Sequence, residues 1–326
     1  MRRIASSIVA VPALLVVFIL ALSPARHLLA ADASDQRLIL GTATQGGGFQ
    51  LFGLALVDAI NAGDSGLQID AIATRGSRQN LALLEGGEVD LGLVEGNAAR
   101  QALDGIGRPP LALSVLSVMY PNPGMFVVRA DSPYLTIEDL RGRPVAFGTR
   151  ASGLRILADD VLDGLGLSAT DDFQQLILEK AADGPRLVLE RKAEALWGAG
   201  IGWPGFVKVA EAPGGARFIA PSAEQVARIL ERHPHLREMS LPAGTYQGQD
   251  QRIDSVGLWS LILVRPDLPD STAYRLAEAI HRSQPALAER LSQGRYTTAQ
   301  NTASQVPAER IHPGAARYYR ERGLLR

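Results

Sequence analysis

The feature that most constrains this fold is a strand that ends in a glycine-containing loop and continues into a helix. It occurs twice within the first hundred residues. The apolar run 38–40 precedes Gly41-Thr42-Ala43-Thr44-Gln45-Gly46-Gly47-Gly48, and the run 69–73 precedes Arg75-Gly76-Ser77-Arg78-Gln79-Asn80. A helix that begins this way has backbone N–H groups without partners in its first turn, where the helix dipole also favours negative charge. The paired loops therefore predict a pocket for a small carboxylate or phosphate.

The alternation of strand and helix continues along the chain. A third glycine-containing loop, 148–153, follows a predicted strand at 144–147 and precedes a predicted helix over 154–165. Ser255–Val264 reads as one continuous strand. Alternation of this kind is typical of an α/β fold with mainly parallel sheets, in which sites form at the carboxyl ends of the strands.

Composition excludes several classes of protein. The chain has 326 residues, which is enough for two domains, and a net charge of −1, which gives no basic surface for nucleic acid. It contains no cysteine, which excludes disulfides, thiol nucleophiles and cysteine-bound zinc. The sequence also lacks a P-loop, a G-x-S-x-G elbow, an H-E-x-x-H pair and an EF-hand loop.

The amino-terminal segment has the pattern of an export signal. Arg2 and Arg3 precede an apolar stretch over 8–22, and Ala31-Asp32-Ala33 offers a cleavage site between small residues. We expect residues 1–33 to be a signal peptide, or an anchor if they are not cleaved, and the mature chain to lie in the periplasm. No later segment is long and apolar enough to span a membrane.

Four further motifs have an ordinary interpretation beside a functional one. Gly200–Gly205 matches G-x-G-x-x-G but lacks the acidic residue of a dinucleotide site, so we expect a tight turn. His233-Pro234-His235 has no third ligand nearby in the sequence, so we expect loop residues and no metal. Ser152 has no identifiable base and is expected to cap a helix or donate a hydrogen bond. Arg75 and Arg78 are either partners of a carboxylate or solvated charges.

Several segments together resemble the TAXI family, the extracytoplasmic solute receptors that work with TRAP transporters. In order along the chain they are 40–49, 76–94, 139–146, 151–153, 241–249 and 312–319. The resemblance implies a type II periplasmic binding-protein fold, in which two α/β lobes enclose a ligand cleft. Lobe 1 would comprise 34–124 plus 262–326 and lobe 2 would comprise 125–261, with 125–129 and 255–264 as the crossovers.

The resemblance also implies a function. The protein would bind a small organic anion, a dicarboxylate or an amino acid such as glutamate or 2-oxoglutarate, by closing its cleft, and would deliver it to a TRAP-type membrane permease. It would be a monomer with no cofactor and no catalytic residues. Two other readings stay open: an enzyme on the same fold, and a signalling or scaffold protein that has the fold but no transporter.

The glycine loops and the resemblance together place a set of residues at the ligand. They are Thr44, Gln45, Gly46, Gly47, Gly48, Phe49, Gly76, Ser77, Asn80, Glu95, Asn97, Thr149, Arg150, Ala151, Ser152, Gly153, Trp203 and Tyr246. Three positions depart from the family pattern. Phe49 and Gln50 stand where tyrosines are usual, and Glu95 begins a Glu-Gly-Asn triplet where Gln-Ser-Asp is frequent. A cleft-facing Glu95 would oppose an anion or select an ammonium group, and Arg150 would compensate its charge.

Overall fold

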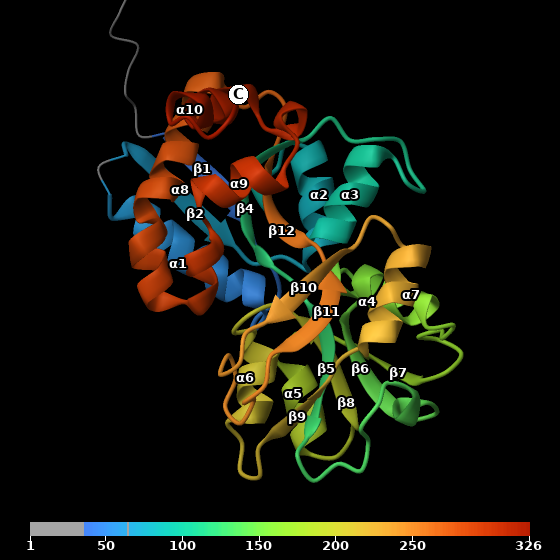
Figure 1. The fold of residues 1–326 in the computed structure, drawn as a ribbon. Coiled ribbons are helices and arrows are strands. Elements are labelled where there is room, and N and C mark those ends of the chain that lie inside the picture. Colours follow the sequence, from blue (N-terminus) through green and yellow to red (C-terminus); the bar gives the residue numbers. More distant parts are fainter. Residues whose placement is uncertain (1–35, 64) are drawn as a thin grey trace, which may run out of the picture. The chain divides into compact units, whose positions relative to one another are not determined.

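The computed structural model describes residues 36–63 and 65–326, which belong to one compact unit (Figure 1). The predicted signal segment 1–33 lies outside the described residues. Among the helices that are described, none combines the length and apolar character needed to cross a membrane.

The first of two five-stranded sheets has the strand order β2-β1-β3-β12-β4. Strand β1 runs parallel to β2 and β3, whereas β12 is antiparallel to both β3 and β4. The bounds of its strands are β1 Gln36–Gly41, β2 Leu67–Ile72, β3 Leu91–Val94, β4 Ser114–Pro121 and β12 Trp259–Val264. Its helices are α1 Gly48–Asn61, α2 Ser77–Glu85, α3 Gly96–Asp104, α8 Asp270–Arg290, α9 Ala299–Gln305 and α10 Pro313–Glu321. We call this sheet with its helices the first lobe.

The second five-stranded sheet has the order β7-β6-β8-β5-β9, with β6 parallel to β7 and β8 and with β5 antiparallel to β8 and β9. Its strands are β5 Gly124–Arg129, β6 Pro144–Thr149, β7 Gln174–Leu178, β8 Ala195–Ala199 and β9 Ala216–Ile219. Its helices are α4 Leu154–Gly164, α5 Asp183–Leu189, α6 Pro204–Ala210 and α7 Ala223–Arg232. An antiparallel pair, β10 Arg237–Leu241 and β11 Ile253–Gly257, completes this second lobe.

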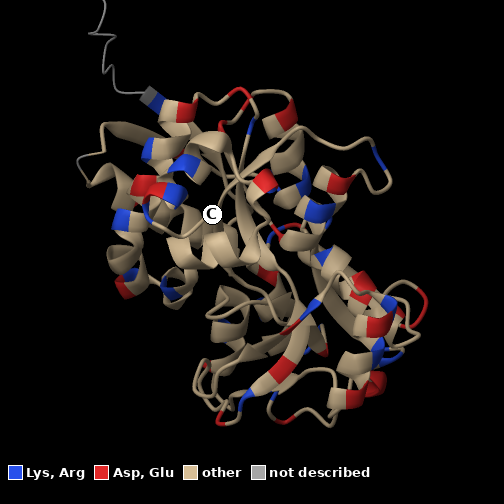
Figure 2. Cartoon of the chain, turned by 45° about the horizontal axis from the view of Figure 1, so that its top comes forward, with Lys and Arg blue, Asp and Glu red and all other residues tan. Residues whose placement is uncertain are grey.

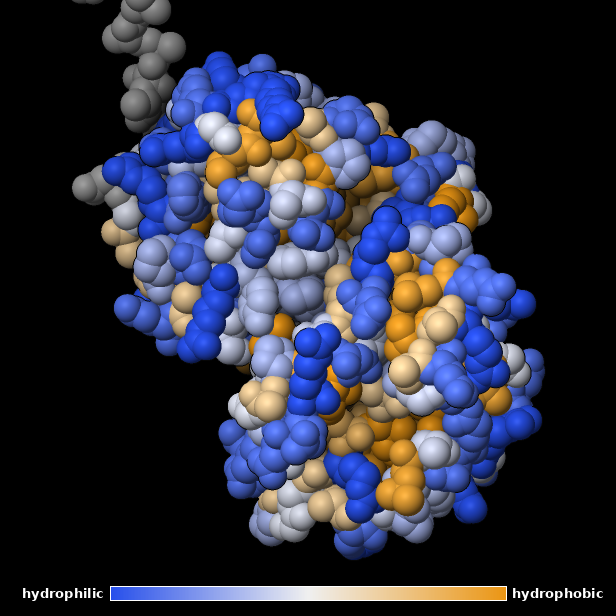
Figure 3. Space-filling view, in the orientation of Figure 1, coloured by the Kyte–Doolittle hydropathy of each residue, from blue (hydrophilic) through white to orange (hydrophobic). Residues whose placement is uncertain are grey.

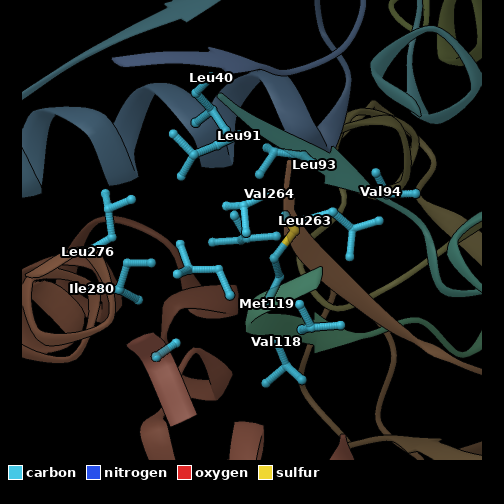
Figure 4. Packing of buried hydrophobic residues seen from close by; sticks show 14 of the residues in the cluster. Leu40, Leu91, Leu93, Val94, Val118, Met119, Leu263, Val264, Leu276 and Ile280 are labelled. Carbon is cyan, nitrogen blue, oxygen red and sulfur yellow. The ribbon is translucent and has the colours of Figure 1, made fainter. Parts of the chain in front are cut away.

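The central strands carry apolar side chains on both faces because helices cover both sides of the sheet. In the first lobe, Leu91, Leu93 and Val94 of β3 are all buried, and they pack with Leu263 and Val264 of β12 (Figure 4). Phe126, Phe147 and Trp197 form the aromatic centre of a separate cluster in the second lobe. Each lobe therefore has its own core, and the predicted α/β fold is confirmed.

The chain changes sheet at two adjacent places. Strand β4 ends at Pro121 and β5 begins at Gly124, while β11 ends at Gly257 and β12 begins at Trp259. The prediction of one strand over Ser255–Val264 is therefore wrong, because the chain leaves one sheet and joins the other at Leu258.

Close packing between the two crossing segments explains this break. A Cβ atom on Gly257 would lie 1.9 Å from the carbonyl oxygen of Asn122, so only glycine fits there. The backbone N–H of Asn122 donates to the carbonyl of Leu258 at 3.1 Å, and its side-chain amide donates to Ser260 Oγ at 2.7 Å. These bonds tie the two crossing segments to each other.

Candidate functional site

A cavity lies where the carboxyl ends of strands from both sheets meet the first turns of several helices. About 70 Å³ of it is open to the centres of water molecules, which is room for a small ligand. The predicted site residues that line it are Thr44, Gly47, Gly48, Phe49, Gly76, Ser77, Glu95, Thr149, Ser152, Gly153 and Trp203. The other lining residues are Ala43, Arg75, Tyr120, Asn122, Phe147, Gly148, Leu154, Leu178, Ala181, Trp197 and Ala199.

Helices α1, α2 and α4 begin at this cavity. Gly48 and Ser77 are the first residues of α1 and α2, and Gly153 directly precedes α4. The backbone N–H groups of these three residues have no hydrogen-bond partner within the described chain. Unpaired N–H groups at helix starts, with the positive ends of the helix dipoles behind them, favour an anionic group.

Aromatic rings form much of the remaining wall. Phe49 and Trp203 were predicted at the ligand, whereas Tyr120, Phe147 and Trp197 were not. Tyr120 is buried, which raises the pKa of its phenol, and its hydroxyl has no partner among the described residues. The cavity thus offers a polar end formed by helix starts, apolar ring faces, and one phenol that remains protonated.

Glu95 lies at the wall of the cavity but does not act there as a fully ionised carboxylate. The residue is 1% exposed, and its side chain caps helix α3, where it accepts hydrogen bonds from the backbone of Asn97 at 2.9 Å and Ala98 at 3.3 Å. Burial nevertheless raises the pKa of Glu95 to about 8, against the opposing effect of these bonds. At neutral pH most molecules carry a protonated Glu95, so it opposes an anion much less than its residue type implies.

The two lobes touch each other around the cavity. The backbone N–H of Arg78 donates to the carbonyl of Ala151 at 3.2 Å, and the N–H of Ala181 donates to Thr44 Oγ1 at 3.2 Å. Gly153 packs directly against Ser77 and Glu95 of the first lobe. The structure therefore shows a closed cleft.

Comparison of the chain with known protein families identifies the family to which it belongs. A model described as the NMT1-like family matches residues 40–323, which is most of the chain. The chain belongs to the NMT1-like family. This NMT1-like protein also resembles solved structures in fold, at low sequence identity.

Three of these structures illustrate the likeness. The periplasmic aliphatic sulphonate binding protein SsuA from Escherichia coli is 20% identical, with a TM-score of 0.50, over 88% of this chain and 83% of SsuA. A protein from Bordetella bronchiseptica RB50 is 14% identical, with a TM-score of 0.55, over 88% and 98% of the two chains. Tv2483, solved with L-arginine bound, is 10% identical, with a TM-score of 0.50, over 82% and 93%.

These likenesses show the fold of this NMT1-like protein. It is the two-lobed α/β fold of periplasmic binding proteins, as the sequence predicts. SsuA is named as a binding protein.

The remaining predicted site residues do not line the cavity, and most of them support its walls. Gln45 and Ala151 each accept, through their carbonyl oxygens, a backbone hydrogen bond from the opposite lobe. Asn97 is buried and donates a side-chain hydrogen bond to Glu95 at 3.2 Å. The others outside the lining are Gly46, Asn80, Arg150 and Tyr246.

The His-Pro-His motif is placed differently from the sequence-based expectation. Its histidines are largely buried, with 15% and 16% of their side chains exposed, and both face Asp160 of α4. The histidines lie in a loop, as expected, but the expectation that they are exposed is wrong, because Asp160 from a helix about 70 residues earlier in the chain contacts both of them.

Acidic and basic residues are interspersed along both lobes (Figure 2), and hydrophilic residues cover most of the face seen in Figure 3, with smaller apolar areas between them. This distribution fits the near-zero net charge of the chain.

Asn80 holds the first sheet together, and we expect its loss to destabilise the protein. Its side-chain amide is buried and donates to the carbonyls of Gly41 at 3.1 Å, Thr42 at 2.7 Å and Leu93 at 2.8 Å. Asn80→Ala leaves buried acceptors without this donor, which costs about 2–3 kcal/mol of unfolding free energy. Urea denaturation of the variant and the wild-type protein will measure this loss of unfolding free energy. Gln79→Ala on the same helix is the control, and equal losses in the two variants would contradict the assignment.

Tyr246 supports the cavity from behind Trp203. Its hydroxyl accepts from the backbone N–H of Trp203 at 2.8 Å and donates to the carbonyl of Gly200 at 3.0 Å. Tyr246→Phe removes both bonds and keeps the ring stacked on Phe218, so we expect a loss of about 1–2 kcal/mol in unfolding free energy and weaker ligand binding. Denaturation and titration calorimetry test the two effects, and an unchanged midpoint would show that water replaces the hydroxyl.

Proposed function

We propose that this protein is an extracytoplasmic solute receptor that binds a small organic anion by closing its two lobes and delivers it to a membrane permease. The observation that carries the proposal is the convergence of three helix starts, with unpaired N–H groups at Gly48, Ser77 and Gly153, on one cavity. Fixed N–H donors bind a ligand without chemical change, and the lining contributes no pair of groups arranged as nucleophile and base.

We propose the predicted lobes, 34–124 with 262–326 and 125–261, with the second boundary moved to Leu258. The two sheets support this division, because strand β12 joins the first sheet from Trp259 onward. The two tied crossing segments at 122–123 and 258 would then be the hinge, and ligand contacts from both lobes would favour the closed state.

The lining supports a ligand with an acidic group, a short apolar body and a second polar group. The helix starts would take a carboxylate, and the rings of Phe49, Tyr120 and Trp203 would cover the apolar body. A protonated Glu95 can donate a hydrogen bond to a second carboxylate, and an ionised one can accept from an ammonium group. We therefore propose a dicarboxylate or an acidic amino acid, such as 2-oxoglutarate or glutamate.

Thermal unfolding in the presence of single compounds tests this proposal. The panel contains glutamate, aspartate, 2-oxoglutarate, succinate and, because SsuA is named as a sulphonate binding protein, an aliphatic sulfonate. A ligand at 100 times its Kd stabilises the folded state by about 2.7 kcal/mol, which raises the midpoint by several degrees. If only the sulfonate stabilises the protein, the proposed ligand class would change from carboxylates to sulfonates. Mass spectrometric detection of a product would overturn the receptor function in favour of an enzyme.

The transporter partner is proposed to be of the TRAP type, on the strength of the sequence resemblance to TAXI receptors. Proteoliposomes that contain a TRAP permease should take up the labelled ligand only when this receptor is added. Ligand binding without uptake would favour the signalling or scaffold alternative. Export is tested separately by sequencing the amino terminus of protein recovered from the periplasm, where cleavage after the predicted signal segment 1–33 is expected.

A further inference from the structure

Two histidines and an aspartate form a compact cluster in the second lobe, apart from the ligand cavity. Asp160 lies on helix α4, and His233 and His235 lie on the segment between α7 and β10. His235 Nε2 is 3.0 Å from Asp160 Oδ2, and His233 Nδ1 is 3.6 Å from Asp160 Oδ1. One nitrogen or oxygen from each residue lies within 4.8 Å of the other two, so the three can face a common point.

The residues around the cluster also contact it as residues around a metal site do. His233 Nε2, the ring nitrogen that faces away from Asp160, is 2.8 Å from Asp163 Oδ2. Asp163 is in turn held by Arg232, through Nε and through Nη2 at 2.8 Å. A carboxylate on the second ring nitrogen of a ligating histidine fixes the ring orientation and raises its basicity.

Burial and donor chemistry narrow the choice of ion. Side chains of the three inner residues are 15–19% exposed, so water can reach the cluster and complete a coordination sphere. Two imidazoles and one carboxylate are ligands that suit a borderline cation such as Zn²⁺. They suit Ca²⁺ and Mg²⁺ less well, because those cations prefer oxygen ligands only. The charge of Arg100, on α3 of the first lobe, also acts on His235 and opposes a cation, so we expect moderate affinity.

We propose that Asp160, His233 and His235 bind a divalent transition-metal ion, with zinc the best fit, and that Asp163 orients His233 from outside the coordination sphere. The ion would join α4 to the segment after α7, and α4 is the helix whose start lines the ligand cavity. Without a metal, the same residues form only a hydrogen-bonded ion-pair network, and this is the competing explanation.

Calorimetric titration with zinc chloride tests the proposal. The full-length protein is first freed of metal by a chelator and dialysis. We expect one ion per chain with a Kd in the micromolar range or below. Co²⁺ should give the visible absorption bands of a four- or five-coordinate site. Affinity should fall at acidic pH, because protons then compete with the metal for the imidazole nitrogens.

Single variants separate the metal site from the ion-pair network. His235→Gln and Asp160→Asn remove ligands and should weaken zinc binding at least about 100-fold, whereas Asp163→Asn should weaken it about 10- to 100-fold. His281→Gln is the control, since His281 lies outside the cluster and bonds to Tyr318. Circular dichroism of each metal-free variant checks the fold. No zinc binding up to millimolar concentration, or binding retained by both ligand variants, overturns the proposal.

Discussion

Gly153→Ala should weaken ligand binding at least about 10-fold, and Gly153→Val about 100-fold, with both lobes still folded. A Cβ atom at Gly153 would lie 2.6 Å from Glu95 Cβ and 2.9 Å from Ser77 Oγ. Both of these groups belong to the opposite lobe, so the clash exists only while the cleft is closed. The backbone of Gly153, with φ −65° and ψ −26°, is open to any residue, so the substitution causes no strain within its own lobe.

Titration calorimetry with the compound selected from the panel measures the affinity of both variants. Thermal unfolding without ligand should show little change, because the open state accepts the added methyl group. Gly63→Ala is the matched control, since a Cβ there meets nothing closer than 3.4 Å. Full affinity in the Gly153 variants would show that the ligand is bound without the closure seen in the structure, and would remove the basis of the hinge mechanism.

How much of this could be predicted from the sequence depends on how local each feature is. The helix starts at Gly48, Ser77 and Leu154 follow from glycines and apolar runs only a few residues away, and the structure places all three at the cavity. His312 and Pro313 likewise mark the start of α10 by local sequence, because a cap and its helix are adjacent in the chain.

The aromatic wall was missed because its residues read as core. Tyr120, Phe147 and Trp197 lie in buried strands, where an apolar run looks the same whether a ring packs inward or borders a cavity. Whether a ring packs inward or borders the cavity is decided by the register of its strand in the sheet. That register is set by contacts between distant segments.

The partners of polar residues depend on distant contacts for a related reason. Asn80 and Tyr246 have the chemistry of ligand donors, but the amide N–H groups of Asn80 and the hydroxyl of Tyr246 are bonded to backbone groups from distant parts of the chain. Residue type indicates which bonds a side chain can make, whereas the fold decides which partners are within reach.

Glu95→Gln should remove a dependence of stability on pH. The pKa of Glu95 rises from its ordinary 4.5 to about 8 in the folded protein, so between these values the folded state binds more protons than the unfolded state. The contribution of Glu95 to stability is therefore full below about pH 4.5 and is lost as pH rises through about 8, by a total on the order of 5 kcal/mol. The glutamine keeps an acceptor for the backbone of α3 but does not titrate, so the variant should be the more stable protein at pH 9.

Urea denaturation of both proteins from pH 5 to pH 9 measures this difference, with Glu238→Gln, at an exposed position on β10, as the control. Ligand affinity measured over the same pH range tests the role of Glu95 in binding. If Glu95 donates a hydrogen bond to a carboxylate, the affinity of the wild-type protein for a dicarboxylate falls above pH 8, whereas the affinity of Glu95→Gln does not. If the two stability profiles instead run parallel, Glu95 is ionised at neutral pH despite its burial. The cavity would then present a negative charge beside the helix starts, and an amino acid would be its ligand in preference to a dicarboxylate.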